Sequence, residues 1–401
     1  MSTSRTDASA QSRSRLVRRV LLGITLVFAT GMAIGHQYSS VLGFTPIGVD
    51  GLCPFGGLET LYSLFAGGTL IRRVAMSSVV LFAGSVILTF VFRRSFCGQI
   101  CPLGALQGIF GWLGTRGMRK RFTMPAILDR PARYLKYALL VFFGVWTWWA
   151  ADLVMRPYDA WAAWAHITSP EVFTEFSIGL SILGVSLAGS FFYDRFFCKY
   201  LCPMGAFLAL FSTLSFLGIR RDAVACIDCD KCDGACPMNI EVSTAATVTA
   251  SECISCNECV NVCPAAGALE VKSSPGARRA IRPLVATALV AGLFVGPIAL
   301  ARATGLVSFT QPTIAQAVER AGGTFDTSLI KGSSPMSQIV DATGIPTQGF
   351  MDTFGVSEAD MGRPIKEIKG KYGFSPHEVR AWVAVQLGLE VPAGEEHGDE
   401  H

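Results

Sequence analysis

Between Cys226 and Pro264 the chain repeats one cysteine pattern, and this repeat constrains the fold more than any other feature of the sequence. Each copy reads Cys-x2-Cys-x2-Cys-x3-Cys-Pro. Because proline restricts its own backbone and that of the preceding residue, Pro237 and Pro264 are expected to end the two cysteine loops. The eight cysteines are Cys226, Cys229, Cys232 and Cys236 in the first copy and Cys253, Cys256, Cys259 and Cys263 in the second.

This spacing is that of the ligand run in bacterial two-cluster ferredoxins, in which the fourth cysteine of each copy binds the other cluster. It therefore predicts two [4Fe–4S] clusters. The predicted ligands are Cys226, Cys229, Cys232 and Cys263 for the first cluster and Cys253, Cys256, Cys259 and Cys236 for the second. A zinc module is disfavoured because zinc sites rarely use three cysteines in close series plus a fourth before proline. A disulfide scaffold needs no such repeat.

The low charge of the chain indicates a membrane protein. Of its 401 residues, 51% are hydrophobic and only 16% are charged, whereas about a quarter of the residues in soluble domains are charged. A transmembrane helix needs ~20 predominantly apolar residues. Apolar runs predict five spans, at roughly 20–35, 74–91, 134–155, 176–192 and 283–303. The expected fold is an all-α polytopic membrane protein that carries an inserted ferredoxin module.

Lys and Arg residues cluster in alternate connections between these spans. Five precede the first span, eight lie between the second and third, and nine lie between the fourth and fifth. The connections 36–73 and 156–175 contain only two and one. Because Lys and Arg favour the cytoplasmic side, the amino terminus, loop 93–133 and the cysteine repeat are predicted to face the cytoplasm, where thiols also stay reduced. A multi-pass protein of the cytoplasmic (inner) membrane is expected.

A second repeat follows the second and fourth predicted spans. RSFCGQICPLGAL (Arg94–Leu106) and RFFCKYLCPMGAF (Arg195–Phe207) share Arg-x-Phe-Cys-x3-Cys-Pro-x-Gly-Ala. If each cysteine pair lies on a helix, its two side chains share one face. Four cysteines are therefore predicted to converge into a redox or metal site at the inner membrane surface: Cys97, Cys101, Cys198 and Cys202. A third cluster, another metal and a thiol pair all fit the spacing, as do small buried residues at a helix–loop junction.

Cys53 stands apart from both repeats. The stretch Cys53–Leu58 resembles Cys101–Leu106 but lacks the first cysteine. A lone cysteine cannot hold a cluster, so Cys53 either starts a helix with proline in its first turn or contacts a quinone or a partner's cofactor. The five tryptophans between 146 and 164 are interpreted as an aromatic belt at the membrane–water boundary, with a quinone-binding wall as the alternative.

Five parts are expected along the chain. Residues 1–15 form a disordered cytoplasmic amino terminus, 16–221 the four-helix membrane region with the Cys-x3-Cys-Pro repeats, 222–275 the cytoplasmic ferredoxin module, 281–303 the fifth transmembrane helix, and 304–401 a small helical extracytoplasmic domain with an acidic tail. The last part contains 13 Asp and Glu against 7 Lys and Arg. It resembles a helix-turn-helix locally, but nucleic acid is not an expected partner because binding it requires a basic face.

With these twelve cysteines in this order, roughly residues 16–275 resemble the NapH/NosR-type membrane polyferredoxins. The resemblance implies an electron-transfer protein of the cytoplasmic membrane. NapH-type members are regarded as quinol dehydrogenase components that feed extracytoplasmic reductases. This chain differs from the simplest pattern by its fifth span and its outer domain, and it has no evident site for the covalent flavin of NosR-type members. The terminal electron acceptor is therefore not implied.

The expected function is electron transfer between the quinone pool, or a cytoplasmic donor, and a partner oxidoreductase. The hydrocarbon core of a membrane is ~30 Å thick, which is too far for one useful electron step. A quinone, a haem or flavin on a partner, or the four-cysteine site must bridge it. The alternative function is that of an assembly or regulatory factor that reduces a metal or thiol during maturation of a respiratory enzyme. A passive membrane anchor for a soluble oxidoreductase is a further option.

Overall fold

The computed structural model describes residues 3–38, 46–58, 61, 76–118, 124–150, 154–273, 280–305, 307, 310, 313–320, 323, 325–330, 332 and 334–389. Arg72, Arg73 and the acidic tail, for which the sequence makes predictions, lie outside these ranges. The chain divides into two compact units. The first, here called the cysteine unit, comprises 1–37 and 47–309, and the second, the carboxyl-terminal unit, comprises 38–46 and 310–401. Each is described by itself.

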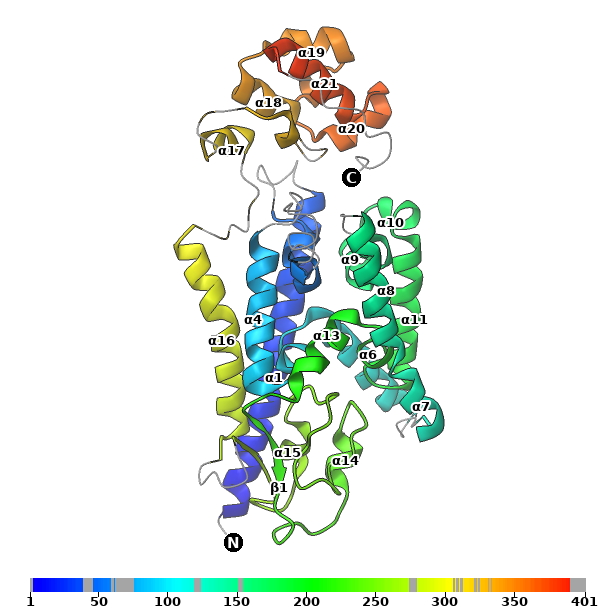
Figure 1. The fold of residues 1–401 in the computed structure, drawn as a ribbon, viewed down its shortest axis with the longest axis vertical. Coiled ribbons are helices and arrows are strands. Elements are labelled where there is room, and N and C mark those ends of the chain that lie inside the picture. Colours follow the sequence, from blue (N-terminus) through cyan, green and yellow to red (C-terminus); the bar gives the residue numbers. More distant parts are fainter. Residues whose placement is uncertain are drawn as a thin grey trace. The chain divides into compact units, whose positions relative to one another are not determined.

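Helices occupy all five apolar runs of the cysteine unit. They are α1 (Thr3–Gln37), α4 (Met76–Phe92), α8 (Leu135–Ala150), α11 (Ser177–Phe192) and α16 (Pro283–Ala303). Within the described residues, Ser9–Gln37 and Pro283–Ala303 are long and apolar enough to cross a membrane, while α4 and α11 are apolar but shorter. Helix α16 packs beside α4 and α1 (Figure 1). Further short helices are η1 (Val49–Leu52), α5 (Ser95–Gln99), α7 (Ala126–Ala132), η2 (Arg156–Tyr158), α9 (Ala160–Ala165), α10 (Glu171–Thr174) and α12 (Phe196–Tyr200).

Glycine allows two of the helices to touch through their backbones. Helix α6 (Pro102–Met118) packs along α11. A Cβ at Gly114 would lie well inside 3.0 Å of the carbonyl oxygen of Phe191, closer than Cβ atoms are found in proteins. Small residues bring helices together in this way in membrane proteins, where the hydrophobic effect does not drive helices against one another.

Helix α1 differs from its prediction at the amino terminus. The sequence predicts disorder through residue 15, but the helix begins at Thr3. Its early turns are bound to the cysteine module: Gln11 Nε2 donates to the carbonyl oxygen of Cys263 at 3.0 Å, and Arg15 Nη2 donates to that of Asn261 at 3.2 Å. Polar composition predicts disorder because a segment buries too little apolar surface by itself. Here, contacts with residues about 250 positions away supply the missing partners.

The Cys-x3-Cys-Pro elements do not form continuous helices, which corrects the expectation that each cysteine pair shares one helix face. Helix α5 ends at Gln99, and α6 begins at Pro102. In the second copy α12 ends at Tyr200, and α13 (Pro203–Ser212) begins after Cys202, its N-cap residue. The proline explains the break, because its ring disfavours helical backbone at the residue before it. The second cysteine of each element thus lies between two helices.

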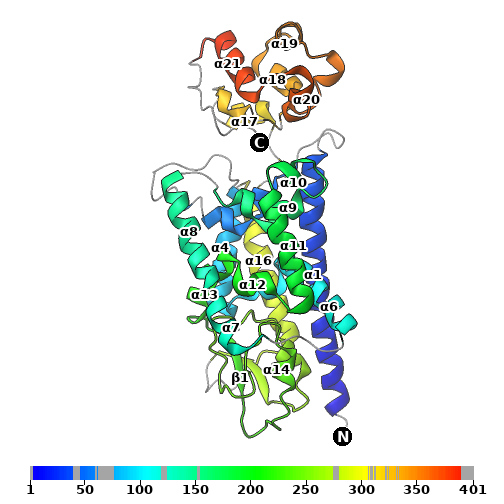
Figure 2. The ribbon, with the colours of Figure 1, turned by 90° about the vertical axis from the view of Figure 1, so that its right-hand side faces the viewer.

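The cysteine repeat folds as a small module at one end of the unit, the end where the amino terminus lies (Figures 1 and 2). Strands β1 (Gly218–Arg221) and β2 (Leu269–Lys272) pair antiparallel, with Ile219 opposite Val271. Helices α14 (Lys231–Ala235) and α15 (Glu258–Val262) lie between them in sequence. The first strand begins before residue 222, the predicted start of the module, because Ile219 belongs to the hydrophobic core of the module.

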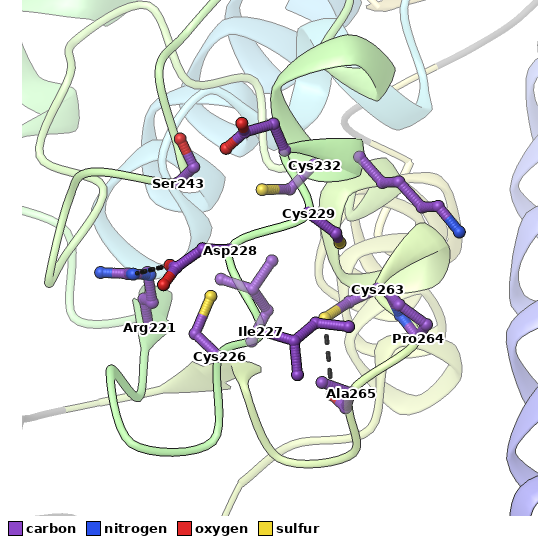
Figure 3. A pocket seen from close by; sticks show the side chains of 13 residues that line it. Arg221, Cys226, Ile227, Asp228, Cys229, Cys232, Ser243, Cys263, Pro264 and Ala265 are labelled. Atoms are coloured by element: carbon purple, nitrogen blue, oxygen red, sulfur yellow. Dashed lines mark hydrogen bonds and ion pairs between the residues drawn. The ribbon is translucent and has the colours of Figure 1, made fainter.

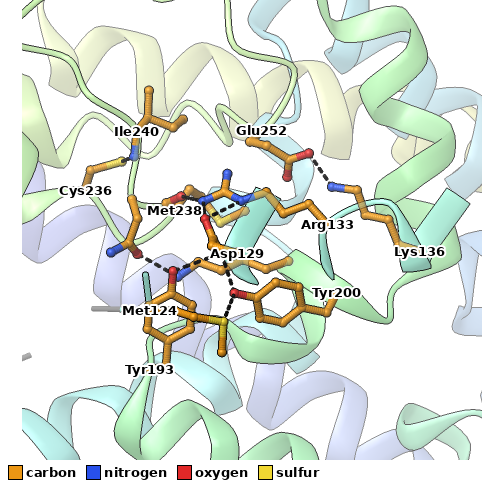
Figure 4. Close-up of polar contacts among 12 residues, drawn as sticks. Met124, Asp129, Arg133, Lys136, Tyr193, Tyr200, Cys236, Met238, Ile240 and Glu252 are labelled. Atoms are coloured by element: carbon orange, nitrogen blue, oxygen red, sulfur yellow. Dashed lines mark hydrogen bonds and ion pairs between the residues drawn. The ribbon is translucent and has the colours of Figure 1, made fainter. Parts of the chain in front are cut away.

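Glu252 ties this module to the helices through a buried ion pair (Figure 4). Its carboxylate accepts hydrogen bonds from Arg94, at 3.1 Å, and from Lys136 of α8. Both cationic side chains have 0% exposure. Burial by itself would raise the pKa of Glu252, but the two cations outweigh it and hold this pKa below its ordinary value. The loop that precedes the second cysteine copy is therefore fixed to α8 and to the α4–α5 junction.

The carboxyl-terminal unit is a helical duplication. Residues 335–354 and 364–383 each contain a helix, a glycine turn and a second helix. Gly344 and Gly373 end the first helices with left-handed backbone, which glycine adopts without strain. Pro335 and Pro364, 29 residues apart, face each other in an antiparallel bridge. The elements are α17 (Ile314–Arg320), η3 (Thr327–Leu329), α18 (Met336–Thr343), α19 (Thr347–Phe354), η4 (Glu358–Asp360), α20 (Ile365–Tyr372) and α21 (Pro376–Leu387).

Corresponding apolar residues of the two copies form one core. Met336 and Ile339 from the first copy and Ile365 and Ile368 from the second are almost completely buried. A polar cluster lies beside this core, where Asp360 accepts hydrogen bonds from Lys371 Nζ at 2.6 Å and from the Tyr372 hydroxyl at 2.6 Å. The sequence predicts several of these short helices but not the duplication, because the copies share residue types rather than identical residues.

We expect Glu252→Ala to destabilise the cysteine unit by about 3–5 kcal/mol, because it leaves two buried cations without their carboxylate. The matched control is Glu270→Ala, which removes a half-exposed partner of Lys272 in the same module and should cost about 0–1 kcal/mol. Thermal unfolding of the full chain in detergent, with iron content as a second readout, measures the difference. Equal losses in the two variants would show that the buried ion pair contributes no more than a surface pair.

We expect Asp360→Asn to loosen the carboxyl-terminal unit in a pH-dependent manner. The hydrogen bond from Lys371, followed by that from Tyr372, lowers the pKa of Asp360 from its ordinary 3.8 to about 2. A lowered folded-state pKa contributes stability above the unfolded-state pKa, and this contribution is lost as the pH falls through the folded-state value. Amide hydrogen exchange in α20 should therefore be faster in the variant above pH 4, and the difference should disappear as the pH falls below about 2. Asp352→Asn, on the exposed face of α19, is the control and should change little at any pH.

Candidate metal centres

Four cysteines of the module surround one cavity, here called the outer cavity. Cys226, Cys229, Cys232 and Cys263 line it, and the cavity encloses about 360 Å³ (Figure 3). Three of them come from the first copy of the repeat and the fourth from the second. Cys229 is exposed and the other three are half-buried. Ile227, Asp228 and Pro264 also line the cavity, so its mouth is close to the protein surface.

The other four cysteines surround an inner cavity. Cys236, Cys253, Cys256 and Cys259 line a space of about 320 Å³ together with apolar side chains that include Ile219, Met238, Val248 and Ile254. Three of these cysteines are buried and Cys236 is half-buried. The structure therefore brings together the two groups of four that the spacing predicts, with the fourth cysteine of each copy exchanged. It also distinguishes them, since Cys229 of the first group is exposed whereas three cysteines of the second group are buried.

Left-handed backbone bends both loops around their cavities. The residues on either side of Cys229, Asp228 and Asp230, have φ angles of 48° and 52°. The equivalent neighbours of Cys256 are Ser255 and Asn257, with 45° and 59°. Asp and Asn tolerate this conformation better than most residues because their short side chains hydrogen-bond locally. Helices α14 and α15 start directly after these bends and end at Cys236 and Cys263, each of which precedes a proline.

The sulfur chemistry fits an iron–sulfur cluster in each cavity. Burial raises the pKa of Cys236 to about 12 and that of Cys232 to about 11, so thiols here lose their protons only when a cation binds them. Four thiolates are the donor set that holds a [4Fe–4S] cluster. The amide of Ile240 already donates to Cys236 Sγ at 3.4 Å, and hydrogen bonds to sulfur are one means by which proteins adjust cluster potentials.

Among the described residues, no three His, Cys, Asp or Glu side chains lie close enough together to hold one metal ion. This finding includes the eight cysteines of the module, although they surround two cavities. A [4Fe–4S] cluster occupies more space than a single ion, so its four ligands stand farther apart.

The cysteines of the second repeat gather in one region beside the module. Cys97 and Cys198 are buried, and Cys101 and Cys202 are half-buried. Their thiols are near enough to interact electrostatically with one another. Cys198 Sγ accepts a hydrogen bond from Gln107 Nε2 at 3.3 Å, and Cys202 Sγ accepts one from the amide of Gly205 at 3.2 Å. We call these residues the four-cysteine group.

The two repeat elements are interlocked through their arginines. Arg195 of the second element donates from Nη1 to the carbonyl oxygen of Cys97, at 2.9 Å, in the first. The guanidinium of Arg195 lies over Gly104 of the first element, and the guanidinium of Arg94 lies over Gly205 of the second. A Cβ at either glycine would lie within 3.0 Å of the opposite guanidinium, so a larger residue would displace the end of that arginine side chain. The Gly of the shared pattern therefore makes room for a reciprocal contact.

Several residues of this region have no role in the sequence predictions. Arg94 and Arg195 appear there as the first residue of the shared pattern and as charges that indicate membrane orientation, without a predicted role, although both are buried. Their repetition at one position of the two elements was the available signal. The sequence contains no such signal for Glu252 or Lys136, because no motif or repeat around either residue marks them as partners. Cys53 lines neither cavity and packs against the hydrophobic core that contains Cys97.

Comparisons with known proteins match both cysteine repeats to iron–sulfur domains. A family model described as a 4Fe-4S dicluster domain matches residues 218–264. A model described as a 4Fe-4S binding domain matches residues 74–121 and 177–220, which contain the two Cys-x3-Cys-Pro elements. No solved structure matches this chain.

Three relatives show the extent of the similarity. YccM of Escherichia coli (strain K12), named for electron transport, is 31% identical over 212 residues, 52% of this chain and 58% of YccM. Protein MJ0750 of Methanocaldococcus jannaschii, which is uncharacterized, is 31% identical over 198 residues, 48% of this chain and 75% of MJ0750. The ferredoxin-type protein NapH of Escherichia coli (strain K12) is 27% identical over 182 residues, 45% of this chain and 59% of NapH.

The chain thus spans less than two thirds of the length of YccM and of NapH. The family-model matches cover the segments that carry both cysteine repeats. Together with the two cavities and the apolar helices, these matches show that the chain belongs to the NapH/NosR-type membrane polyferredoxins, a family of iron–sulfur electron-transport proteins.

Proposed function

We propose that this protein is a membrane-bound electron carrier whose module holds two [4Fe–4S] clusters. Cys226, Cys229, Cys232 and Cys263 would bind the cluster of the outer cavity, and Cys236, Cys253, Cys256 and Cys259 that of the inner cavity. The observation that carries the proposal is the exchange of the fourth cysteine between the two copies, which closes two separate four-sulfur cavities. Each cluster, when bound, would supply one-electron redox chemistry.

The residues around the cavities would give the two clusters different surroundings. Ile219, Met238 and Val248 give the inner cavity an apolar lining, while the amide of Ile240 and the guanidinium of Arg93 face its sulfurs. Exposed Cys229 instead places the outer cavity within reach of another redox protein. Hydrogen bonds to the sulfurs and solvent exposure are two of the variables that set cluster potentials. The outer cavity is therefore the proposed point of exchange with a soluble donor or acceptor.

The four-cysteine group is the proposed third redox centre. Cys97, Cys101 and Cys202 share a hydrophobic core with residues of the inner cavity, and Cys198 lies near Cys202. Both segments that contain these cysteines match a model described as a 4Fe-4S binding domain. Arg94 supports the same reading: it is fully buried, and its Nε and Nη2 have no hydrogen-bond partner among the described residues. A buried cation with free donors favours thiolates over neutral thiols nearby.

The proposed setting is the cytoplasmic membrane, with five spans and the module on the cytoplasmic side. The length and composition of α1 and α16 support it, as does the clustering of Lys and Arg in alternate connections. In this setting the carrier would connect a quinone or a cytoplasmic donor with a partner oxidoreductase. Relatives whose names refer to ferredoxin-type proteins support a role in such a chain, although this chain spans only part of their length.

Replacing one ligand of each cavity tests the two-cluster proposal. Cys229→Ser should remove the electron paramagnetic resonance signal of the outer cluster and Cys256→Ser that of the inner cluster, each with loss of about half of the module's iron, because each cavity has four sulfur ligands. Cys53→Ser is the matched control, since Cys53 lines neither cavity, and it should keep both signals. The proposal would be wrong if Cys229→Ser and Cys256→Ser removed the same signal, or if wild-type protein held no iron.

The third centre has its own test. Cys97→Ser and Cys198→Ser should each abolish a further paramagnetic signal or metal complement while preserving both signals of the module, because the two residues belong to the same group. Metal analysis and spectroscopy of the full chain in detergent measure this, again with Cys53→Ser as control. Unchanged metal content and spectra in both variants would show that the four cysteines have only a structural role.

A further inference from the structure

Gly98 brings the first repeat element into backbone contact with the inner cavity. It follows Cys97 directly, and it is buried against Ile254, which lies between the cavity residues Cys253 and Cys256. A Cβ at Gly98 would fall well inside 3.0 Å of the carbonyl oxygen of Ile254, a separation that Cβ atoms essentially never show. Only glycine fits here, because the obstacle is backbone and cannot rotate away.

Two hydrogen bonds hold this contact in register. Gln99 Nε2 donates to the carbonyl oxygen of Ser255 at 2.7 Å, and both groups are buried. Arg18 of α1 donates from Nε to the carbonyl oxygen of Gly98 at 3.1 Å, and its guanidinium also pairs with Glu258 at the start of α15. Residues of α1, of α5 and of the loop before α15, which are distant in sequence, thus fix this contact through hydrogen bonds as well as packing.

The second repeat element reaches the same cavity from its equivalent position. Lys199 follows Cys198 as Gly98 follows Cys97, and its side chain has 0% exposure. Its Nζ donates to Asn239 Oδ1 at 2.7 Å. Asn239 immediately precedes Ile240, whose amide donates to the sulfur of Cys236. Each element therefore contacts one ligand loop of the inner cavity, directly after its first cysteine.

One hydrophobic core joins the two sites. Cys97, Ile254 and Cys256 are buried members of it, and Cys101, Cys202 and Cys236 pack against it. The outer cavity is not part of this core; Cys232 and Cys263 pack instead against the core of the module, which also contains Cys253 and Cys259. The inner cavity is therefore the neighbour of both the outer cavity and the four-cysteine group.

We propose that Gly98 is a positioning residue whose missing side chain couples the inner cavity to the four-cysteine group, so that the two exchange electrons across the Gly98–Ile254 contact. The inference rests on the proposed function. Cys253 is covalently bonded to Ile254, and Cys97 is covalently bonded to Gly98. The Gly98–Ile254 contact is therefore the one through-space step between Cys253 and Cys97. The exchange is balanced without a further reactant, because the single electron lost by the centre at one site is gained by the metal centre at the other, and no proton moves.

The test compares Gly98→Ala with Gly108→Ala in full-length protein purified in detergent. A Cβ at Gly108 meets nothing within 4 Å, so the control adds the same methyl group without a collision. Iron and sulfide content and the spectra of the module's clusters are measured first. Dithionite then reduces the protein, and freeze-quenched samples give the reduction rate of the four-cysteine centre and its magnetic coupling to the inner cluster.

Gly98→Ala should retain both module clusters but lose the magnetic coupling and slow the reduction of the four-cysteine centre, because the added Cβ forces the two backbones apart. Gly108→Ala should behave as wild type. Coupling and rate unchanged in Gly98→Ala, or no third centre in wild type, would overturn the inference while the two-cluster proposal stands. Absence of the module's clusters from wild type would overturn the proposed function itself.

Gln99→Leu provides a second variant that adds no bulk at the contact. It removes the hydrogen bond to Ser255 and so loosens the same contact without a collision. If Gly98→Ala loses its inner cluster altogether, Gln99→Leu decides: weakened coupling with both clusters retained supports the inference, and wild-type coupling overturns it.

Discussion

The buried pairing of Glu252 with Arg94 and Lys136 is the interaction on which the rest of the cysteine unit depends. Two cations without exposure are expensive to bury, and one carboxylate from the module compensates both. Arg94 belongs to a Cys-x3-Cys-Pro element, Lys136 to an apolar helix, and Glu252 directly precedes Cys253. The ion pair therefore joins the three parts that an electron carrier must keep in fixed order. A module of this kind is not a separate ferredoxin attached by a linker.

Around that ion pair the structure relies on close backbone approach at glycines. The backbone of Phe191 lies against Gly114, the backbone of Ile254 lies against Gly98, and the guanidinium of Arg195 lies against Gly104. Each of these contacts shortens the distance between segments that carry cysteines or support them. The reciprocal contacts of the two arginines make the repeat elements a single structural piece, so that four cysteines from distant parts of the chain share one region.

The cysteines of the two cavities differ in exposure, and this difference distinguishes a solvent-facing site from a buried one. The outer cavity has an exposed cysteine, three cysteines of the inner cavity are buried, and residues of the four-cysteine group share a core with the inner cavity. The helices long enough to cross a membrane, α1 and α16, both contact α5 of the first repeat element, and α1 also contacts Cys263 of the outer cavity. Family membership and geometry together support electron transport through these sites.

Local spacing by itself determined which cysteines belong together, because Cys-x2-Cys-x2-Cys loops bend around one space and a following proline ends each loop. The apolar runs of the sequence likewise located the long helices. Tertiary structure alone decided the rest. The early turns of α1 contact Asn261 and Cys263, the second cysteine of each Cys-x3-Cys pair lies between two helices, and Glu252 pairs with cations from two other elements. These outcomes depend on which segments pack together and on how buried charges are compensated, and neither is encoded in the spacing of a single stretch.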